Sequence, residues 1–229
     1  MTLLEICLDD LGGAAIAEEN GADRIELCAD LPHGGTTPSL GTVSAALASI
    51  TSVGVQVLIR QRPGDFVYRG LEIDAMVRDI EVIAALSRPP GVTVGFVVGA
   101  LRDDGRIDVP VMTRLLRACG PAPVTLHRAF DATAHPLEAL EVAVDLGIHR
   151  VLTAGGPGSA DTQLDGLATL VRAAAGRISI LAAGGIRAHN VAEVVRRTGV
   201  GEVHLRATPT TSPSATSAEV IRAVRTELA

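Results

Sequence analysis

The sequence predicts a single-domain (β/α)8 barrel, the TIM barrel, over residues 1–229. Short β-branched or leucine-rich runs alternate with helical patterns along the chain, and eight such runs are present. Parallel strands require a connecting segment that is usually a helix, and a closed barrel of this kind usually takes about 250 residues. An open doubly wound sheet is the alternative, but no G-x-G-x-x-G motif follows the first strand pattern.

The expected strands are separated by segments with helical periodicity. Residues Ser39, Asp108 and Asp161 stand where helix N-caps are expected. The segment TPTTSPSAT (208–216) is rich in Thr, Ser and Pro and is expected to form a loop before the last helix. One buried helical stripe is predicted from apolar residues spaced three and four apart, namely Ile73, Met76, Val77, Ile80 and Ile83. The expected strands cover residues 3–8, 24–29, 56–60, 93–98, 124–127, 150–153, 179–182 and 202–205.

Composition excludes several classes of function. With 47% hydrophobic residues the chain can bury a large core. A net charge of −6, 2% aromatic residues and no basic run give no footprint for nucleic acid. All 20 basic residues are Arg, which excludes a Schiff-base lysine, lysine-bound pyridoxal phosphate (PLP) and a nucleotide-binding P-loop. The sequence shows no apolar run long enough to span a membrane and no basic leader. Its three cysteines are an odd number, which argues for reduced thiols and not for a set of disulfides. We therefore expect a cytoplasmic protein without a membrane partner.

A short repeat places polar side chains inside the expected barrel. LEICLD (4–9) and IELCAD (25–30) share the pattern apolar-Glu-apolar-Cys-x-Asp on neighbouring strands. Because strand side chains alternate, the Glu, Cys and Asp of each repeat should face the axis. We expect Glu5 to contact His204, Glu26 to contact Arg60, and His127 to project from the opposite wall. An ion network that only holds the barrel together is the alternative to chemistry at these residues.

Two thiols on adjacent strands suggest a metal site. Cys7 and Cys28 could bind Cu(I), which prefers soft thiolate ligands, with His204 as a third ligand. The alternative is that these cysteines pack as small buried apolar side chains.

An enzyme acting on a small anion is the rival prediction. The active end of such a barrel lies at the C-terminal ends of its strands. His127 would serve there as acid or base, Glu5 or Glu26 as a carboxyl of raised pKa, and Arg60 as an orienting cation. The expected reaction is an isomerisation, elimination or hydrolysis of a phosphate- or carboxylate-bearing metabolite. The expected anion-binding residues are Arg62, Thr153, Gly155, Gly156, Gly184 and Gly185, although the glycines equally suit tight turns.

Seven ordered blocks between about residues 3 and 206 resemble the CutC family of copper homeostasis proteins. The resemblance implies a cytoplasmic TIM barrel that is often assembled into homo-oligomers and that the family name associates with copper handling. The chain departs from the family pattern at Gln61, Pro63 and Ala154, and it carries Leu205 and Arg206 where small residues are usual. The blocks are GADRIELCAD (21–30), GGTTPSLG (34–41), IRQRPGDFVY (59–68), DDGRID (103–108), VTLHRAFD (124–131), RVLTAGG (150–156) and AAGGI (182–186).

Overall fold

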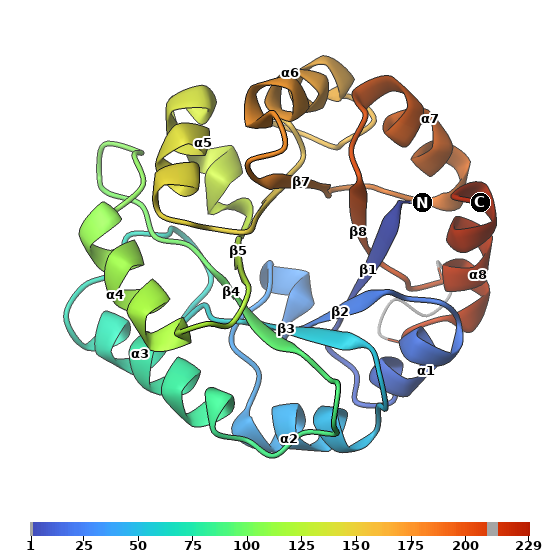
Figure 1. Ribbon diagram of the computed structural model, residues 1–229, viewed down its shortest axis with the longest axis horizontal. Helices are drawn as coiled ribbons and strands as arrows, with labels where there is room; N and C mark the ends of the chain where they lie inside the picture. The colour runs from blue at the N-terminus through green and yellow to red at the C-terminus, as the bar shows by residue number, and fades with distance from the viewer. Residues whose placement is uncertain (1, 210–214) are drawn as a thin grey trace.

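Eight parallel strands close into a barrel in the computed structural model, which describes residues 2–209 and 215–229 (Figure 1). The strands follow one another around the barrel in chain order, and β1 (Leu3–Leu8) pairs with β8 (Glu202–Arg206) to complete it. In this last pairing Glu5 lies opposite His204 and Cys7 opposite Arg206. The predicted closed barrel is therefore confirmed, and the open sheet is excluded.

The strand ends differ from the predicted ends by at most two residues. The prediction placed Arg60 and His127 on strands, whereas both lie just beyond the last paired residue. The backbone of Arg60 instead bonds to Thr37, whose side-chain oxygen accepts from the Arg60 N–H at 2.9 Å. The remaining strands are β2 (Arg24–Leu27), β3 (Gly54–Leu58), β4 (Val94–Val98), β5 (Val124–Leu126), β6 (Arg150–Thr153) and β7 (Ser179–Ala182).

Helices surround the barrel, one after each strand (Figure 1). Two short 3-10 helices, η1 (Leu31–His33) and η2 (Arg128–Ala132), follow β2 and β5 before the main helices begin. The main helices are α1 (Gly13–Glu19), α2 (Leu40–Ala48), α3 (Leu71–Ala84), α4 (Val109–Cys119), α5 (Pro136–Asp145), α6 (Leu164–Ala174), α7 (Ala188–Thr198) and α8 (Ala218–Glu227).

Most of the predicted helix signals are confirmed. Ser39 caps α2 by accepting from Thr42 N–H at 3.1 Å, and Asp108 caps α4 by accepting from Val111 N–H at 3.0 Å. The predicted cap at Asp161 is wrong, because α6 begins at Leu164 and the Asp161 carboxylate accepts from the Ser159 hydroxyl instead. Of the predicted loop 208–216, residues 210–214 lie outside the described residues.

The core lies between the strands and the helices. Leu4, Ile6 and Leu8 of β1 are buried in the hydrophobic core that includes the helix side chains. The predicted stripe of α3 is confirmed as well, since Met76 and Ile80 are fully buried. This packing leaves the axis to the alternate, polar side chains. None of the helices in the described ranges 2–209 and 215–229 has the length and apolar character needed to cross a bilayer.

Candidate functional site

Closure of the barrel brings an acid, an imidazole and a guanidinium together on the axis. Nδ1 of His204 lies 2.7 Å from Oε1 of Glu5, which confirms the predicted contact. Arg24 donates to the other oxygen of Glu5 and also to Glu202, at 2.6 Å. Burial raises the pKa of Glu5, but the hydrogen bond from His204 and the charge of Arg24 outweigh it and hold that pKa at about 2. Glu5 is therefore an ionised carboxylate that fixes the orientation of His204.

Glu26 is also buried on the axis, but its partners differ from the predicted one. Glu26 and Arg60, both within the described residues, form no ion pair. Oε2 of Glu26 instead lies 3.6 Å from Nε2 of His204. Burial raises the pKa of Glu26 to about 8, because the favourable charge of His204 compensates only in part. Glu26 is consequently a neutral carboxyl group near pH 7.

The two predicted thiols lie next to each other. Cys7 and Cys28 are buried, and the thiol of Cys28 hydrogen-bonds to the sulfur of Cys7. This hydrogen bond is the largest influence on Cys7, and it acts with His204 against burial to lower the pKa of Cys7 to about 6. The same contact, together with burial, raises the pKa of Cys28 well above its usual value. At neutral pH Cys7 is thus a thiolate stabilised by a neighbouring thiol.

Ligand atoms of Cys7, Glu26 and His204 all lie within 4.8 Å of one another, close enough to hold one metal ion. Burial lowers the pKa of His204, but hydrogen bonds with Cys7 and Glu5 raise it well above its usual value. A metal ion at this cluster would therefore displace a proton from the imidazole. The sequence predicted Cys7, Cys28 and His204 as ligands and gave Glu26 a catalytic role; the cluster contains Cys7 and His204, with Glu26 as its third residue, whereas Cys28 is not part of it.

A cavity of about 200 Å³ opens onto this cluster. His127 lines it from the opposite wall, as predicted, but its environment does not suit an acid or base. Nδ1 of His127 accepts from Ala129 N–H at 3.1 Å, and burial with the charge of Arg60 lowers the pKa of His127 to about 3. His127 is thus neutral and carries its proton on Nε2. The cavity is lined by Cys7, Glu26, Cys28, Leu31, Gly34, Leu58, Arg60, Phe66, His127, Arg128, Leu152 and His204.

The structure places the predicted anion-binding residues outside the lining of this cavity. Arg62 pairs with Glu72 and Asp65 beside the β3–α3 loop. The hydroxyl of Thr153 donates to Asp131 and accepts from Gly155 N–H at 2.9 Å. A Cβ at Gly155 would lie 2.7 Å from the backbone nitrogen of Leu167, so this glycine is needed for a tight turn.

The other three glycines also belong to turns. Gly156, Gly184 and Gly185 have positive φ angles of 149°, 91° and 75°. The carbonyl of Gly185 accepts from the side chain of Asn190 at 2.9 Å, and the carbonyl of Gly184 accepts from Ala160 N–H at 2.8 Å. Their conformations are those that glycine adopts without strain.

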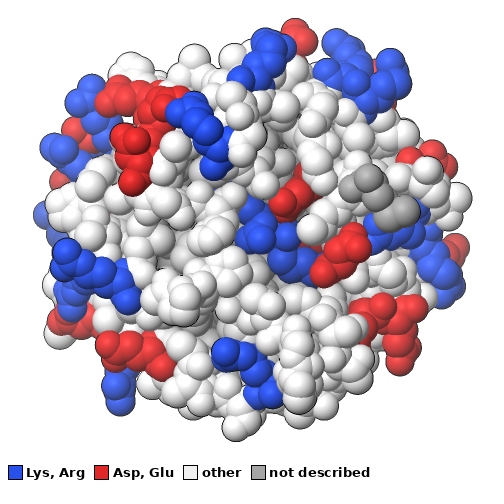
Figure 2. Space-filling view, in the orientation of Figure 1, with Lys and Arg blue, Asp and Glu red and all other residues white. Residues whose placement is uncertain are grey.

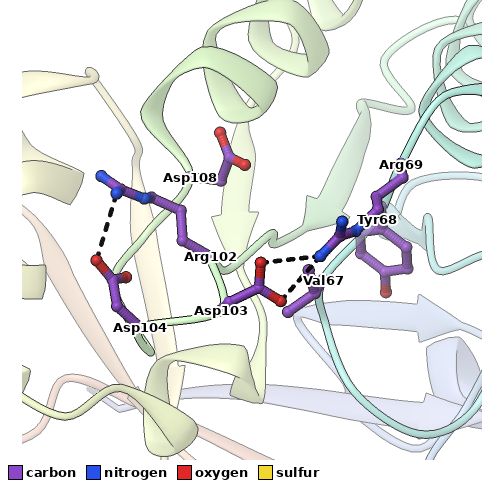
Figure 3. A pocket seen from close by; sticks show the side chains of 7 residues that line it. All are labelled: Val67, Tyr68, Arg69, Arg102, Asp103, Asp104 and Asp108. Carbon is purple, nitrogen blue, oxygen red and sulfur yellow. Dashed lines mark hydrogen bonds and ion pairs between the residues drawn. The ribbon is translucent and has the colours of Figure 1, made fainter.

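A larger hollow of about 420 Å³ lies on the surface between the β3–α3 and β4–α4 loops (Figure 3). Its charged side chains are paired with one another: Arg69 donates to Asp103 at 2.8 Å, and Arg102 lies 3.4 Å from Asp104. These pairs are exposed to solvent, and Asp108, which also lines the hollow, is the N-cap of α4, so the hollow holds no buried charge for a ligand to compensate. Figure 2, by contrast, shows basic and acidic side chains side by side over the barrel axis, within a mainly uncharged surrounding surface.

Sequence reasoning missed two residues of the axial site. Arg24 stands two residues before Glu26, so strand alternation would have placed it on the axis too. Phe66 comes from the β3–α3 loop and contacts both His127, with ring centroids 5.0 Å apart, and Arg60, whose guanidinium carbon is 4.9 Å from the Phe66 ring. No periodic signal could have located a loop residue. Arg206, a departure from the family pattern, donates to Asp9 at 2.7 Å.

The fold and this axial site define a (β/α)8 barrel with buried thiols, carboxyls and an imidazole on its axis. Comparison with known proteins then assigns the family: the CutC family profile matches residues 2–209, and the chain belongs to this family. A CutC family protein of Mesorhizobium japonicum is 47% identical to this chain over 207 residues, which cover 90% of this chain and 78% of the relative. A CutC family protein of Caulobacter vibrioides is 45% identical over 88% of this chain and 80% of its own length.

A solved structure of a CutC protein from Streptococcus agalactiae, by name a proposed copper homeostasis protein, shares the fold. Its TM-score is 0.83 at 31% identity, with 91% of this chain and 100% of that chain covered. The phosphoribosylanthranilate isomerase of Pyrococcus furiosus, at 15% identity and a TM-score of 0.64, is similar in fold alone.

Proposed function

We propose that this chain binds Cu(I) on the barrel axis as part of copper homeostasis, with Cys7, Cys28 and His204 as ligands. The observation that carries the proposal is the buried cluster of Cys7 and His204, whose ligand atoms lie within 4.8 Å of each other, with the thiol of Cys28 as the hydrogen-bonding neighbour of Cys7. Soft sulfur ligands favour Cu(I) over harder cations, and imidazole is an accepted partner. The chemistry of these donors therefore fits the metal that the family name indicates.

Glu26 has a supporting part in this proposal. A carboxylate is a hard ligand and suits Cu(I) poorly, and a carboxyl with a pKa of about 8 is mostly protonated at neutral pH. We assign Glu26 to accept hydrogen bonds beside the thiols and to limit the negative charge there. Glu5 orients His204 through its Nδ1, the kind of outer contact that fixes an imidazole ligand.

The proposal extends to the cellular setting. We place the protein in the cytoplasm as a homo-oligomer with a single domain over residues 1–229, and without a nucleic-acid or membrane partner. The family, the three reduced cysteines and the absence of lysine and of basic runs support this setting.

An anaerobic Cu(I) titration against a chromogenic competitor tests the site. We expect the double variant Cys7→Ser/Cys28→Ser to lose at least about tenfold in affinity, the effect of removing essential metal contacts. Cys119→Ser is the matched control, because Cys119 is a buried thiol at the end of α4, within the hydrophobic core. An unchanged affinity in the double variant would overturn the proposed site.

A further inference from the structure

Arg60 is a buried cation without an acidic partner. The residue is 6% exposed, and its terminal nitrogens donate to the carbonyl oxygens of Gly34, Gly35 and Gly64 at 2.8–3.0 Å. Within residues 2–209 and 215–229, no carboxylate oxygen lies within 4.0 Å of this guanidinium. Its Nε is buried and has no hydrogen-bond partner among the described residues. A buried charge of this kind is costly unless a counter-ion compensates it.

His127 supplies a second unused donor beside it. Because its Nδ1 accepts from the backbone of Ala129, its proton is on Nε2, and this nitrogen is buried without a partner in the described part of the chain. Gly99 leaves room for the ring, because a Cβ at this position would lie 2.5 Å from Cε1 of His127. Phe66 packs against both His127 and Arg60 and keeps the two side chains on one side of the cavity.

The cavity that both side chains line combines these donors with apolar walls. Leu58 and Leu152 lie among its lining residues, and its volume is about 200 Å³. Pockets for larger ligands usually measure about 300–1,000 Å³, so this one suits a molecule of a few non-hydrogen atoms. Arg128, also in the lining, is a half-exposed side chain that pairs with Asp131, which accepts from its Nε at 2.7 Å.

We propose that this cavity is a binding site for a small monocarboxylate, whose oxygens accept from Nε of Arg60 and Nε2 of His127 while its short carbon chain packs on Leu58 and Leu152. Two unused donors match the two oxygens of a carboxylate, whereas a phosphate dianion would need more donors and charge. The site goes beyond copper binding, since neither Arg60 nor His127 is among the proposed metal ligands. It also differs from the anion site predicted from the glycine turns.

The test uses the full-length, metal-free protein in reducing buffer, with propionate and inorganic phosphate as probes. Protein labelled with ¹⁵N-histidine reports on His127 directly in the imidazole region of the NMR spectrum. We expect propionate to shift the His127 Nε2 signal saturably and to leave His149 unchanged. His149 is a suitable internal control, because its Nδ1 likewise accepts a backbone N–H, that of Val124 at 3.2 Å.

Two variants locate the contacts. We expect Arg60→Gln and His127→Phe each to weaken propionate binding by about tenfold or more, as expected for removal of one buried partner of a charge. Arg69→Gln, which removes an arginine paired on the surface with Asp103, should bind propionate like the wild type. No saturable shift of His127, unchanged affinity in both variants, or tighter binding of phosphate than of propionate would each overturn the proposal. Because no metal is present, failure here leaves the copper titration unaffected.

Discussion

Glu5 and His204 are 199 residues apart in the chain and meet at 2.7 Å where β8 closes on β1. This contact couples closure of the barrel to the chemistry on its axis, because the same carboxylate that orients His204 also balances Arg24 of β2. A change at Glu5 should therefore affect both the stability of the fold and the position of the proposed metal ligand.

Substitution Glu5→Gln is expected to destabilise the protein by about 3 kcal/mol, since it leaves a buried guanidinium and imidazole without their shared counter-ion. Urea unfolding at pH 7 measures the free energy directly. Glu141→Gln is the matched control: it breaks an exposed pair with Arg177 and should cost less than about 1 kcal/mol. Equal effects of the two substitutions would contradict the structural role of Glu5.

Glu26 should make stability depend on pH with a sign opposite to that of Glu5. Its pKa is about 8 in the folded protein and 4.5 as the ordinary value, so the folded state retains a proton that the unfolded chain has lost. The stabilisation that the protonated Glu26 carboxyl contributes is fully present below about pH 4.5 and is lost as the pH rises to about 8. The free energy of unfolding of Glu26→Gln, taken relative to that of the wild type, should therefore rise by roughly 2 kcal/mol or more from pH 5 to pH 8.5. Unfolding free energies at these two pH values check this, and a constant difference would refute it.

Cys28 should control the reactivity of Cys7. Because the hydrogen bond from Cys28 is the largest cause of the low pKa of Cys7, Cys28→Ala is expected to move that pKa from about 6 toward 9. The pH dependence of iodoacetamide labelling at Cys7, followed by peptide mass spectrometry, measures this shift. Cys119→Ala should leave the profile unchanged. A profile that is the same in all three proteins would show that Cys28 does not support the thiolate.

Gly99→Ala is expected to destabilise the protein by about 1–3 kcal/mol, because the added Cβ meets the ring of His127. It should also weaken propionate binding by displacing the Nε2 donor. Gly12→Ala is the control, since a Cβ there meets no atom within 4 Å. Thermal unfolding of the two variants gives the comparison, and similar melting temperatures would argue against tight packing around His127.

The sequence was sufficient to predict the barrel and one of the two expected axial contacts, that of Glu5 with His204. Alternation along a strand and closure of eight strands are regular, so Glu5, Cys7 and His204 could be placed on one axis without coordinates. The same regularity would have placed Arg24 there as well.

Contacts beyond the strand ends could not be predicted. Arg60 lies past the end of β3, where no period applies, and its guanidinium turns to loop carbonyls instead of Glu26. The hydroxyl of Thr153 likewise donates to Asp131 and accepts from Gly155 N–H, and these local hydrogen bonds depend on loop geometry. The protonation of Glu26 and the tautomer of His127 also depend on burial and neighbours that only the folded structure shows.

Copper X-ray absorption of the Cu(I)-loaded protein tests the proposed ligand set most directly. The arrangement of Cys7, Cys28 and His204 predicts a spectrum with two sulfur ligands and one nitrogen ligand, and loss of the sulfur contribution in Cys7→Ser/Cys28→Ser. A spectrum with only nitrogen and oxygen ligands in the wild type would contradict the proposed thiol site.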